Sequence, residues 1–402
     1  MTLYEFVMLE QIHHELQSLK DNHLFRTRKL LSGRLGSNLT FNRQNFLSFS
    51  SNDYLGLSQN QHIQDALIEG IHLSGNGMGA SHLISGHHKF HEVFENAFSE
   101  ALHFERALLF SSGYMANMGI ISALVGKDDT IFSDQLNHAS LNDASILSRA
   151  NHKRYRHHDL KYLEELLRVS KSKVKLIVTD GVFSMEGDLA NIPDLLQLCE
   201  TYDAYLYIDD AHGFGVLGKN GKGILQYFYD QEKIKIPYSP RIIYMATLGK
   251  AAGMHGAVMA SSNDLVEYLI QKSKQYIYTT ALPAFMAYGL KESLDQILKA
   301  DQARRHLNKL ITMFRGEIKF QKMSLGNSFT PIQPVIVGSE ISVLRLNQLL
   351  MDKGIYVPAI RPPTVPPGTS RLRISFSALH QDEDVTTLIK NIEDFDSHFD
   401  AH

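Results

Sequence analysis

Short apolar runs alternate with helical patterns between about residue 46 and residue 260. The runs are continuously apolar, which is typical of parallel strands that are buried on both faces of a sheet. The stretches between them repeat apolar residues every three or four positions, as amphipathic helices do. Strands are expected at residues 107–110, 130–132, 174–179, 204–209 and 241–247. This alternation predicts an α/β fold with a mostly parallel sheet flanked by helices.

The pattern changes after about residue 263. Long helical patterns run through residues 264–276 and 290–314, and a compact mixture of short strands and one helix follows. We therefore expect a smaller C-terminal α+β domain over residues 291–402. Residues 46–290 would form the large domain, and residues 1–45 an N-terminal arm packed against both.

Composition narrows the class of protein. The chain has 402 residues, 44% of them hydrophobic, which is enough for more than one lobe. Its net charge of −3 gives no field that would attract nucleic acid or anionic lipid. No stretch reaches the roughly 18 uninterrupted apolar residues of a membrane span, and the first residues lack the pattern of a secretory leader. We expect a cytoplasmic protein without nucleic-acid or membrane partners, whose single Cys199 is a buried, inert thiol.

Polar residues follow each apolar run, where ligands bind in parallel α/β sheets. The small residues Ser111 to Tyr114 open a helical pattern whose backbone N–H groups could bind a phosphate, although an ordinary turn would look the same. Each later candidate could likewise be a solvated or capping turn residue. After the next three runs these candidates are His138; then Asp180, Ser184 and Glu186; then Asp209, Asp210 and His212.

Lys250 follows the last run among small residues. A phosphate-binding P-loop is excluded, because Tyr244 and Ala251 stand where it needs Gly and Ser or Thr. The remaining use of a sheltered lysine is as a nucleophilic amine that forms a Schiff base, which fits pyridoxal phosphate (PLP). PLP also needs a carboxylate that keeps its ring nitrogen protonated. Asp209 is the expected carboxylate, because Asp210 would point to the opposite face of the strand.

Histidines at positions 87 and 91 have the spacing of two metal ligands on one helix face. The chain has 20 histidines, but no HExxH motif is formed and no cysteine or obvious carboxylate completes this pair. We therefore expect no metal site.

Seven motifs carry a resemblance to a known family. They are FSSNDYLGLS, SSGYMANMG, HASLNDAS, TDGVFSMEGDLA, DDAHGFGVLG, TLGKAAG and YTTALP, in this order. The chain resembles the α-oxoamine synthases, PLP-dependent acyltransferases of fold type I, nearly from end to end. Residues 360–380 are most similar to the branch that condenses L-alanine with a pimeloyl thioester, on CoA or acyl carrier protein, in biotin biosynthesis. The resemblance also implies a homodimer whose subunits share their active sites.

The resemblance implies a role for each matching residue around the cofactor ring. Lys250 would hold PLP covalently and exchange the substrate proton, and Asp209 would pair with the pyridine nitrogen. His138 would stack over the ring, while Ser184 and His212 would hydrogen-bond near its phenolate oxygen. At the phosphate end the implied residues are Gly113, Tyr114 and Thr247, with Thr280 a candidate from a second subunit.

On the substrate side the resemblance implies an arginine clamp. Arg361 would grip the amino-acid carboxylate, and the stiff prolines at positions 358, 362 and 363 favour a positioned cation over a solvated one. The other implied substrate residues are Arg26, Asn52, His138 and Thr364.

One departure and several alternatives stay open. His82, His87 and His88 stand where relatives vary, which leaves the acyl-chain site undefined. A family member that uses glycine or another acyl thioester, and an aminotransferase, remain alternatives. A non-catalytic scaffold subunit would not need Lys250, Asp209 or His212.

Overall fold

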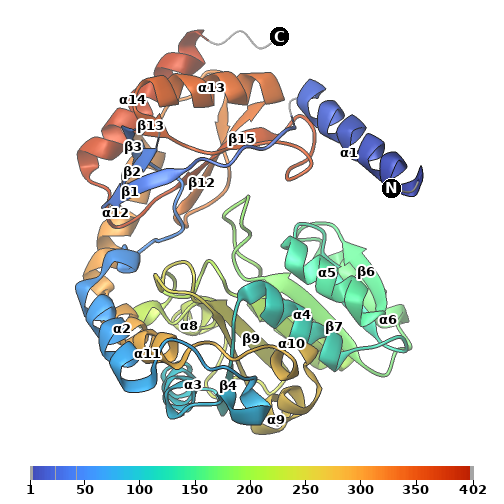
Figure 1. Ribbon diagram of the computed structural model, residues 1–402. Helices are drawn as coiled ribbons and strands as arrows, with labels where there is room; N and C mark the ends of the chain where they lie inside the picture. Colours follow the sequence, from blue (N-terminus) through green and yellow to red (C-terminus); the bar gives the residue numbers. More distant parts are fainter. Residues whose placement is uncertain (1–2, 23, 42, 399–402) are drawn as a thin grey trace.

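A seven-stranded sheet forms the centre of the large part of the molecule (Figure 1). The computed structural model describes residues 3–22, 24–41 and 43–398. In sheet order the strands are β4 (Arg106–Phe110), β10 (Ala257–Ser261), β9 (Ile242–Thr247), β8 (Tyr205–Asp209), β7 (Lys175–Asp180), β5 (Thr130–Asp134) and β6 (Asn151–Tyr155). All five expected strands lie in this sheet, and the α/β prediction is confirmed.

Most strands of the sheet are parallel, and their carboxyl ends therefore meet at one edge. Strands β6, β5, β7, β8 and β9 pair in parallel, with Asp180 of β7 opposite Asp209 of β8. Strand β10 pairs antiparallel with both β9 and β4. The register places the polar residues that follow each strand close together in space.

Helices cover both faces of this sheet. They are α2 (Gln61–Ser74), α3 (Lys89–Leu102), α4 (Gly113–Leu124), α5 (Ala139–Ser148), α6 (Leu160–Val169), α7 (Ile192–Tyr202), α8 (Ile224–Tyr229), α9 (Asn263–Lys272), α10 (Lys274–Ile277) and α11 (Ala284–Lys299). Short helical turns span Leu57–Gln59, His82–Gly86 and Lys219–Gly221. None of the described helices is long and apolar enough to cross a membrane.

Successive residues of the central strands face opposite layers. Ile177 and Ile208 pack in the layer that contains residues of α3, α6, α7 and α11, whereas Val178 and Tyr207 pack with residues of α4, α5 and α9. Because both faces are covered, these strands are apolar without alternation. Cys199 of α7 is buried in the first layer, and burial raises the pKa of its thiol to about 12. The thiol therefore stays protonated, as expected for an inert cysteine.

The smaller α+β domain is also confirmed. Its helices are α12 (Asp301–Glu317), α13 (Glu340–Asp352) and α14 (Asp382–His398). One sheet has the order β11 (Ser324–Leu325), β12 (Ile332–Gly338), β15 (Ser370–Ser375) and β14 (Ala359–Ile360). The domain limits remain a prediction, and residues 1–2 and 399–402 of the two terminal ranges lie outside the described residues.

The N-terminal arm joins this smaller domain through a second sheet. After helix α1 (Leu3–Asp21), the sheet has the order β1 (Leu31–Leu35), β2 (Asn38–Phe41), β3 (Gln44–Ser48) and β13 (Ile355–Tyr356). Strand β3 pairs in parallel with β13, so that Leu47 lies opposite Ile355. The second half of the arm is therefore part of a sheet and not only a packed extension.

Replacing Leu206 by alanine should destabilise the protein by about 2–5 kcal/mol, because it leaves a cavity in the β8 layer. Leu206 is fully buried, whereas Leu30 is 83% exposed. The matched control Leu30→Ala should change the free energy of unfolding by less than about 0.5 kcal/mol. Urea unfolding followed by circular dichroism measures both. Equal losses for the two variants would contradict the assigned core.

Candidate active site

A cavity of about 270 Å³ lies at the carboxyl ends of the parallel strands, beside the start of helix α4. It receives side chains from the loops after β4, β5, β7, β8 and β9. The sequence predicted many of these, because the ends of parallel strands share one edge. The predicted residues that line it are Gly113, Tyr114, His138, Ser184, Asp209, His212, Thr247 and Lys250.

Lys250 contacts a hydrogen-bonded pair of buried side chains. Its Nζ lies 2.9 Å from His212 Nε2, and His212 Nδ1 lies 2.6 Å from the hydroxyl of Tyr54. Tyr54 in turn donates to Asn52 Oδ1 at 3.1 Å. Since that hydroxyl proton is used, His212 Nδ1–H donates to Tyr54 and His212 Nε2 accepts from Lys250. Burial lowers the pKa of His212 well below its usual value, which agrees with a neutral ring.

The amine of Lys250 has a pKa close to neutral pH. Burial lowers the pKa of Lys250 to about 8, although Asp209 and Asp180 oppose that shift. A substantial fraction of this amine is therefore unprotonated and nucleophilic near pH 8.

Asp209 is held as an oriented carboxylate at the cavity wall. Its Oδ2 accepts from Asn117 Nδ2 at 2.8 Å, and its Oδ1 accepts from the Ala211 N–H at 3.1 Å. Asp210 faces away from the cavity, where it accepts from the Tyr244 hydroxyl at 2.7 Å. The opposite orientation of these neighbouring aspartates is the one expected for a strand.

His138 is fixed at the cavity by the helix that it begins. Its Nδ1 accepts from the Ser140 N–H at 3.2 Å as the N-cap of α5, and its own N–H donates to Asp180 Oδ2 at 2.7 Å. Burial lowers the pKa of His138. Asp180 has its pKa raised well above the usual value by burial and by the charge of Asp209. The imidazole is thus a flat, neutral wall of the cavity.

The start of α4 is built to receive an anion. Ser112 caps the helix by accepting from the Met115 N–H at 3.3 Å, which leaves other N–H groups of the first turn directed outward. A Cβ at Gly113 would lie 2.4 Å from Thr247 Cγ2, so only glycine allows this close approach. The buried Thr247 Oγ1 has no hydrogen-bond partner among the described residues. A phosphate here would satisfy both the helix and this hydroxyl.

These observations together test the fit of PLP. The cavity offers an anion seat, a carboxylate, a flat imidazole and an amine of lowered pKa, each from a different strand end. The residues fit the cofactor.

Two arginines of the small domain hold the loop that carries Ser184 to the cavity, and the sequence analysis did not find them. Arg373 of β15 donates from Nε to the Ser184 carbonyl and from its NH1 group to Asn52 Oδ1 at 3.2 Å. Arg371 donates to the Met185 carbonyl at 3.3 Å. The available signal was a pair of arginines two residues apart in an otherwise apolar strand, which places two cations on one buried face. His255 also lines the cavity and was not singled out.

Other predicted residues lie elsewhere. Arg26 and Arg361 line a second cavity of about 520 Å³ between the arm and the small domain. Thr364 donates its N–H to the Arg361 carbonyl at 3.0 Å, and Thr280 forms an isolated bridge with Ser81. The structure does not bring these four residues to the lining of the first cavity, and their roles remain predictions.

Comparison with known proteins agrees with this site. Residues 44–392 match the family model described as aminotransferase class I and II. The chain is 50% identical over 383 residues to the 8-amino-7-oxononanoate synthase of Methylobacillus flagellatus, covering 95% of each chain. The solved 8-amino-7-oxononanoate synthase of Francisella tularensis is 30% identical with a TM-score of 0.75, covering 88% of this chain and 98% of that one.

A cofactor-bound relative has the same fold. A serine palmitoyltransferase variant from S. paucimobilis, solved with a bound PLP–myriocin aldimine, is 26% identical with a TM-score of 0.88, and the match covers 98% of both chains. The match to the family model runs through both domains, and the Methylobacillus relative is similar over nearly the whole chain. The chain therefore belongs to the α-oxoamine synthases, PLP-dependent enzymes of the aminotransferase class I and II family.

Proposed function

We propose that the protein condenses L-alanine with a pimeloyl thioester, releasing the thiol and CO2 and forming 8-amino-7-oxononanoate for biotin biosynthesis. The carrier would be CoA or acyl carrier protein. Relatives 46–50% identical over nearly the whole chain carry the name of this synthase, which supports the substrate pair. The observation that carries the chemistry is the contact of Lys250 with a neutral His212 in the cavity that Asp209 also lines.

Four groups of this chain would hold the cofactor. Lys250 would bind its aldehyde carbon, and Asp209 would face its ring nitrogen. The first turn of α4 and the Thr247 hydroxyl would receive its phosphate, while the His138 ring would cover one face. When bound, PLP supplies an aldehyde that condenses with amines and a ring that accepts electrons from a substrate α-carbon.

Each residue around the cofactor would then have a separate role in the reaction. Lys250 Nζ, once released, would take the α-proton of alanine, because its pKa of about 8 suits proton transfer near neutral pH. His212 Nε2 accepts a hydrogen bond from that amine and so orients its lone pair. The negative charge of Asp209 would favour a positive charge at the ring nitrogen. Arg361 would receive the substrate carboxylate.

Apoenzyme should capture PLP faster as the pH rises from 7 to 9. The protonated amine cannot attack an aldehyde, and a pKa of about 8 leaves about a tenth of the Lys250 amine neutral at pH 7 and about nine tenths at pH 9. The capture rate, followed by stopped-flow absorbance, should therefore rise about tenfold. A simple alkylamine of ordinary pKa, used as the control, should gain about a hundredfold over the same range. A hundredfold gain for the enzyme would mean that the lysine is not perturbed.

Paired substrates test the proposed reaction. Purified holoenzyme is given L-alanine or glycine with pimeloyl-CoA, pimeloyl-acyl carrier protein or a long-chain acyl-CoA, and thiol release is followed. We expect the highest kcat/KM for L-alanine with a pimeloyl thioester. Preference for glycine or for another acyl group would assign the chain to a sister reaction. Conversion of alanine alone to its 2-oxo acid would indicate an aminotransferase.

We further propose that the protein acts as a homodimer. Its location in the cytoplasm stays a prediction. Ile84 and Tyr278 are 81% and 79% exposed, and they flank the bridge between Ser81 and Thr280. Large apolar side chains gathered there favour a protein interface. Light scattering should give about twice the 45.4 kDa chain mass. Ile84→Asp should shift the mass toward the monomer, whereas Val169→Asp, at an exposed site on α6, should not.

A further inference from the structure

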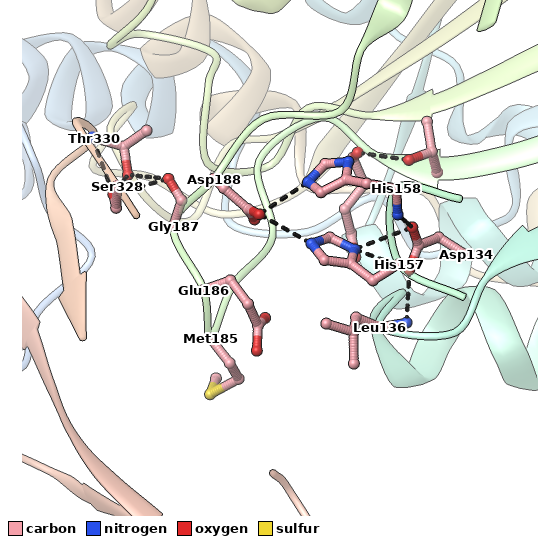
Figure 2. A network of polar contacts seen from close by, with 12 residues as sticks. Asp134, Leu136, His157, His158, Met185, Glu186, Gly187, Asp188, Ser328 and Thr330 are labelled. Carbon is pink, nitrogen blue, oxygen red and sulfur yellow. Dashed lines mark hydrogen bonds and ion pairs between the residues drawn. The ribbon is translucent and has the colours of Figure 1, made fainter. Parts of the chain in front are cut away.

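Two adjacent histidines meet one carboxylate outside the cofactor cavity (Figure 2). Nε2 of His157 and Nε2 of His158 both lie 2.9 Å from Asp188 Oδ2. His157 and His158 follow strand β6, and Asp188 ends the loop that carries Ser184 to the cavity. Three atoms that metals bind therefore converge from two loops, all within 4.8 Å of one another.

The neighbouring groups have the arrangement that a bound cation requires. The second oxygen of the carboxylate, Asp188 Oδ1, is buried and has no hydrogen-bond partner among the described residues. On its far side His157 is bonded through Nδ1 to Asp134, at 3.0 Å from Oδ2. Asp134 is itself fixed by the Leu136 N–H at 2.9 Å. A carboxylate that orients a histidine ligand through its other nitrogen is the usual outer contact of zinc sites.

The spacing of the three atoms suits a small divalent ion. Two ligand atoms on a tetrahedral zinc lie about 3.3 Å apart, since zinc–nitrogen and zinc–oxygen bonds are about 2.0–2.2 Å. Each Nε2 atom, now 2.9 Å from Asp188 Oδ2, would need to move away from that oxygen by only about 0.4 Å. The His158 ring is 42% exposed, which gives an ion and a water ligand a route from solvent.

A second histidine group in the described part of the chain lacks these properties. His82, His87 and His91 also gather three ring nitrogens. However, His91 Nδ1 accepts from the His88 N–H at 2.9 Å, and its Nε2 lies 2.7 Å from the Leu282 carbonyl. Both nitrogens of His91 are thus occupied by backbone groups, and no carboxylate belongs to this group. It serves as an internal control.

We propose that His157, His158 and Asp188 bind one divalent cation, with Zn²⁺ favoured by the two imidazoles and one carboxylate. Both Nε2 atoms would coordinate through their lone pairs, so each must first give up the proton that it now donates to Asp188 Oδ2. His157 would release this proton to solvent, and His158 would transfer its proton to Nδ1 through exchange with water. His157 would keep its Nδ1 proton on Asp134, and His158 would carry its proton on Nδ1. The two negative charges of Asp134 and Asp188 would balance the ion.

The ion would join two loops of the large domain beside the cofactor cavity. The loop that ends at Asp188 is also held by the small domain, where Ser328 and Thr330 donate to the Gly187 carbonyl at 2.8 and 2.9 Å (Figure 2). Binding would therefore stiffen the segment that carries Ser184. This site lies outside the lining of the cofactor cavity and does not depend on the proposed reaction.

Zn²⁺ binding by the holoenzyme tests the proposal. The protein is freed of metal with a chelator and of unbound PLP by gel filtration, then equilibrated with Zn²⁺ and analysed for bound metal. We expect saturation at one ion per chain at this site. His158→Asn should weaken it at least about tenfold, and Asp134→Asn about 10- to 100-fold.

The variants separate binding from folding. His158 has a φ of +60°, a backbone conformation that asparagine tolerates well, so the exchange removes the ligand without straining the loop. His87→Gln, in the other histidine group, should leave the Zn²⁺ affinity unchanged. No saturable Zn²⁺ binding in the parent protein would overturn the proposal. So would undiminished binding in His158→Asn, or loss of binding in His87→Gln.

Discussion

Lys250→Ala should lose turnover by at least about 10³-fold, because it removes both the amine that holds the cofactor and the base that moves the substrate proton. The half-buried lysine contacts His212, and no other lysine lines the cavity among the described residues. Borohydride reduction followed by mass spectrometry should attach the cofactor to the parent chain and not to the variant. Steady-state thiol release gives the loss of turnover.

The control for this variant is the substitution of another lysine whose pKa is also lowered. Burial also lowers the pKa of Lys222, which contacts His103 and does not line the cavity. Lys222→Ala should keep both the covalent cofactor and the turnover. If Lys250→Ala retained near-parent activity, or if both variants lost it equally, the assignment of the nucleophile would be wrong.

Asp209→Asn should lower kcat by about 10²- to 10³-fold, the scale of losing one fixed electrostatic contact in a water-poor site. Asparagine has the shape of aspartate and can still accept from the Ala211 N–H, although it loses the hydrogen bond from Asn117 Nδ2, so the backbone around the cavity should keep its form. The lost charge would leave the ring nitrogen less protonated and the ring a weaker acceptor of electrons. Turnover is measured at saturating PLP, so that weaker cofactor binding does not contribute.

Asp210→Asn is the matched control, one residue away. Burial raises the pKa of Asp210 to about 7, so asparagine resembles a form that the side chain already adopts. Because Asp210 contacts Tyr244 on the other side of the strand, turnover per folded molecule should be nearly unchanged. Equal losses in kcat for the two variants would show that general damage to β8, and not the charge at position 209, causes the effect.

The large sheet could be predicted where its strands are buried on both faces. Strand β6, at one edge of the sheet, was missed because its sequence, NHKRY, is polar and mostly exposed. Strand β10 was not predicted either, although it is buried throughout. Its antiparallel direction depends on how the chain returns and not on local pattern. The joining of β3 to β13 is likewise a contact between distant segments that no local pattern encodes.

The site was predictable to the extent that it consists of strand ends. His138, Asp209 and Lys250 share one cavity because parallel strands bring their carboxyl ends together. Arg373 was missed because its contact with Ser184 joins segments nearly 190 residues apart. The group of His157 and Asp188 was missed because its residues come from two separate loops. The sequence analysis considered His87 and His91 instead, but in the structure His91 Nδ1 is hydrogen-bonded to the backbone.

The parallel pairing of β3 with β13 sets an order of events during synthesis. Leu47 leaves the ribosome about 300 residues before its partner Ile355, which corresponds to roughly 15–60 s of translation. Through that interval the three antiparallel strands β1 to β3 have an open edge at β3, and an open strand edge can pair with another nascent chain. The second sheet can therefore be completed only after Ile355 and Tyr356 have left the ribosome, so the N-terminal strands depend for their last partner on a segment made almost at the end of synthesis.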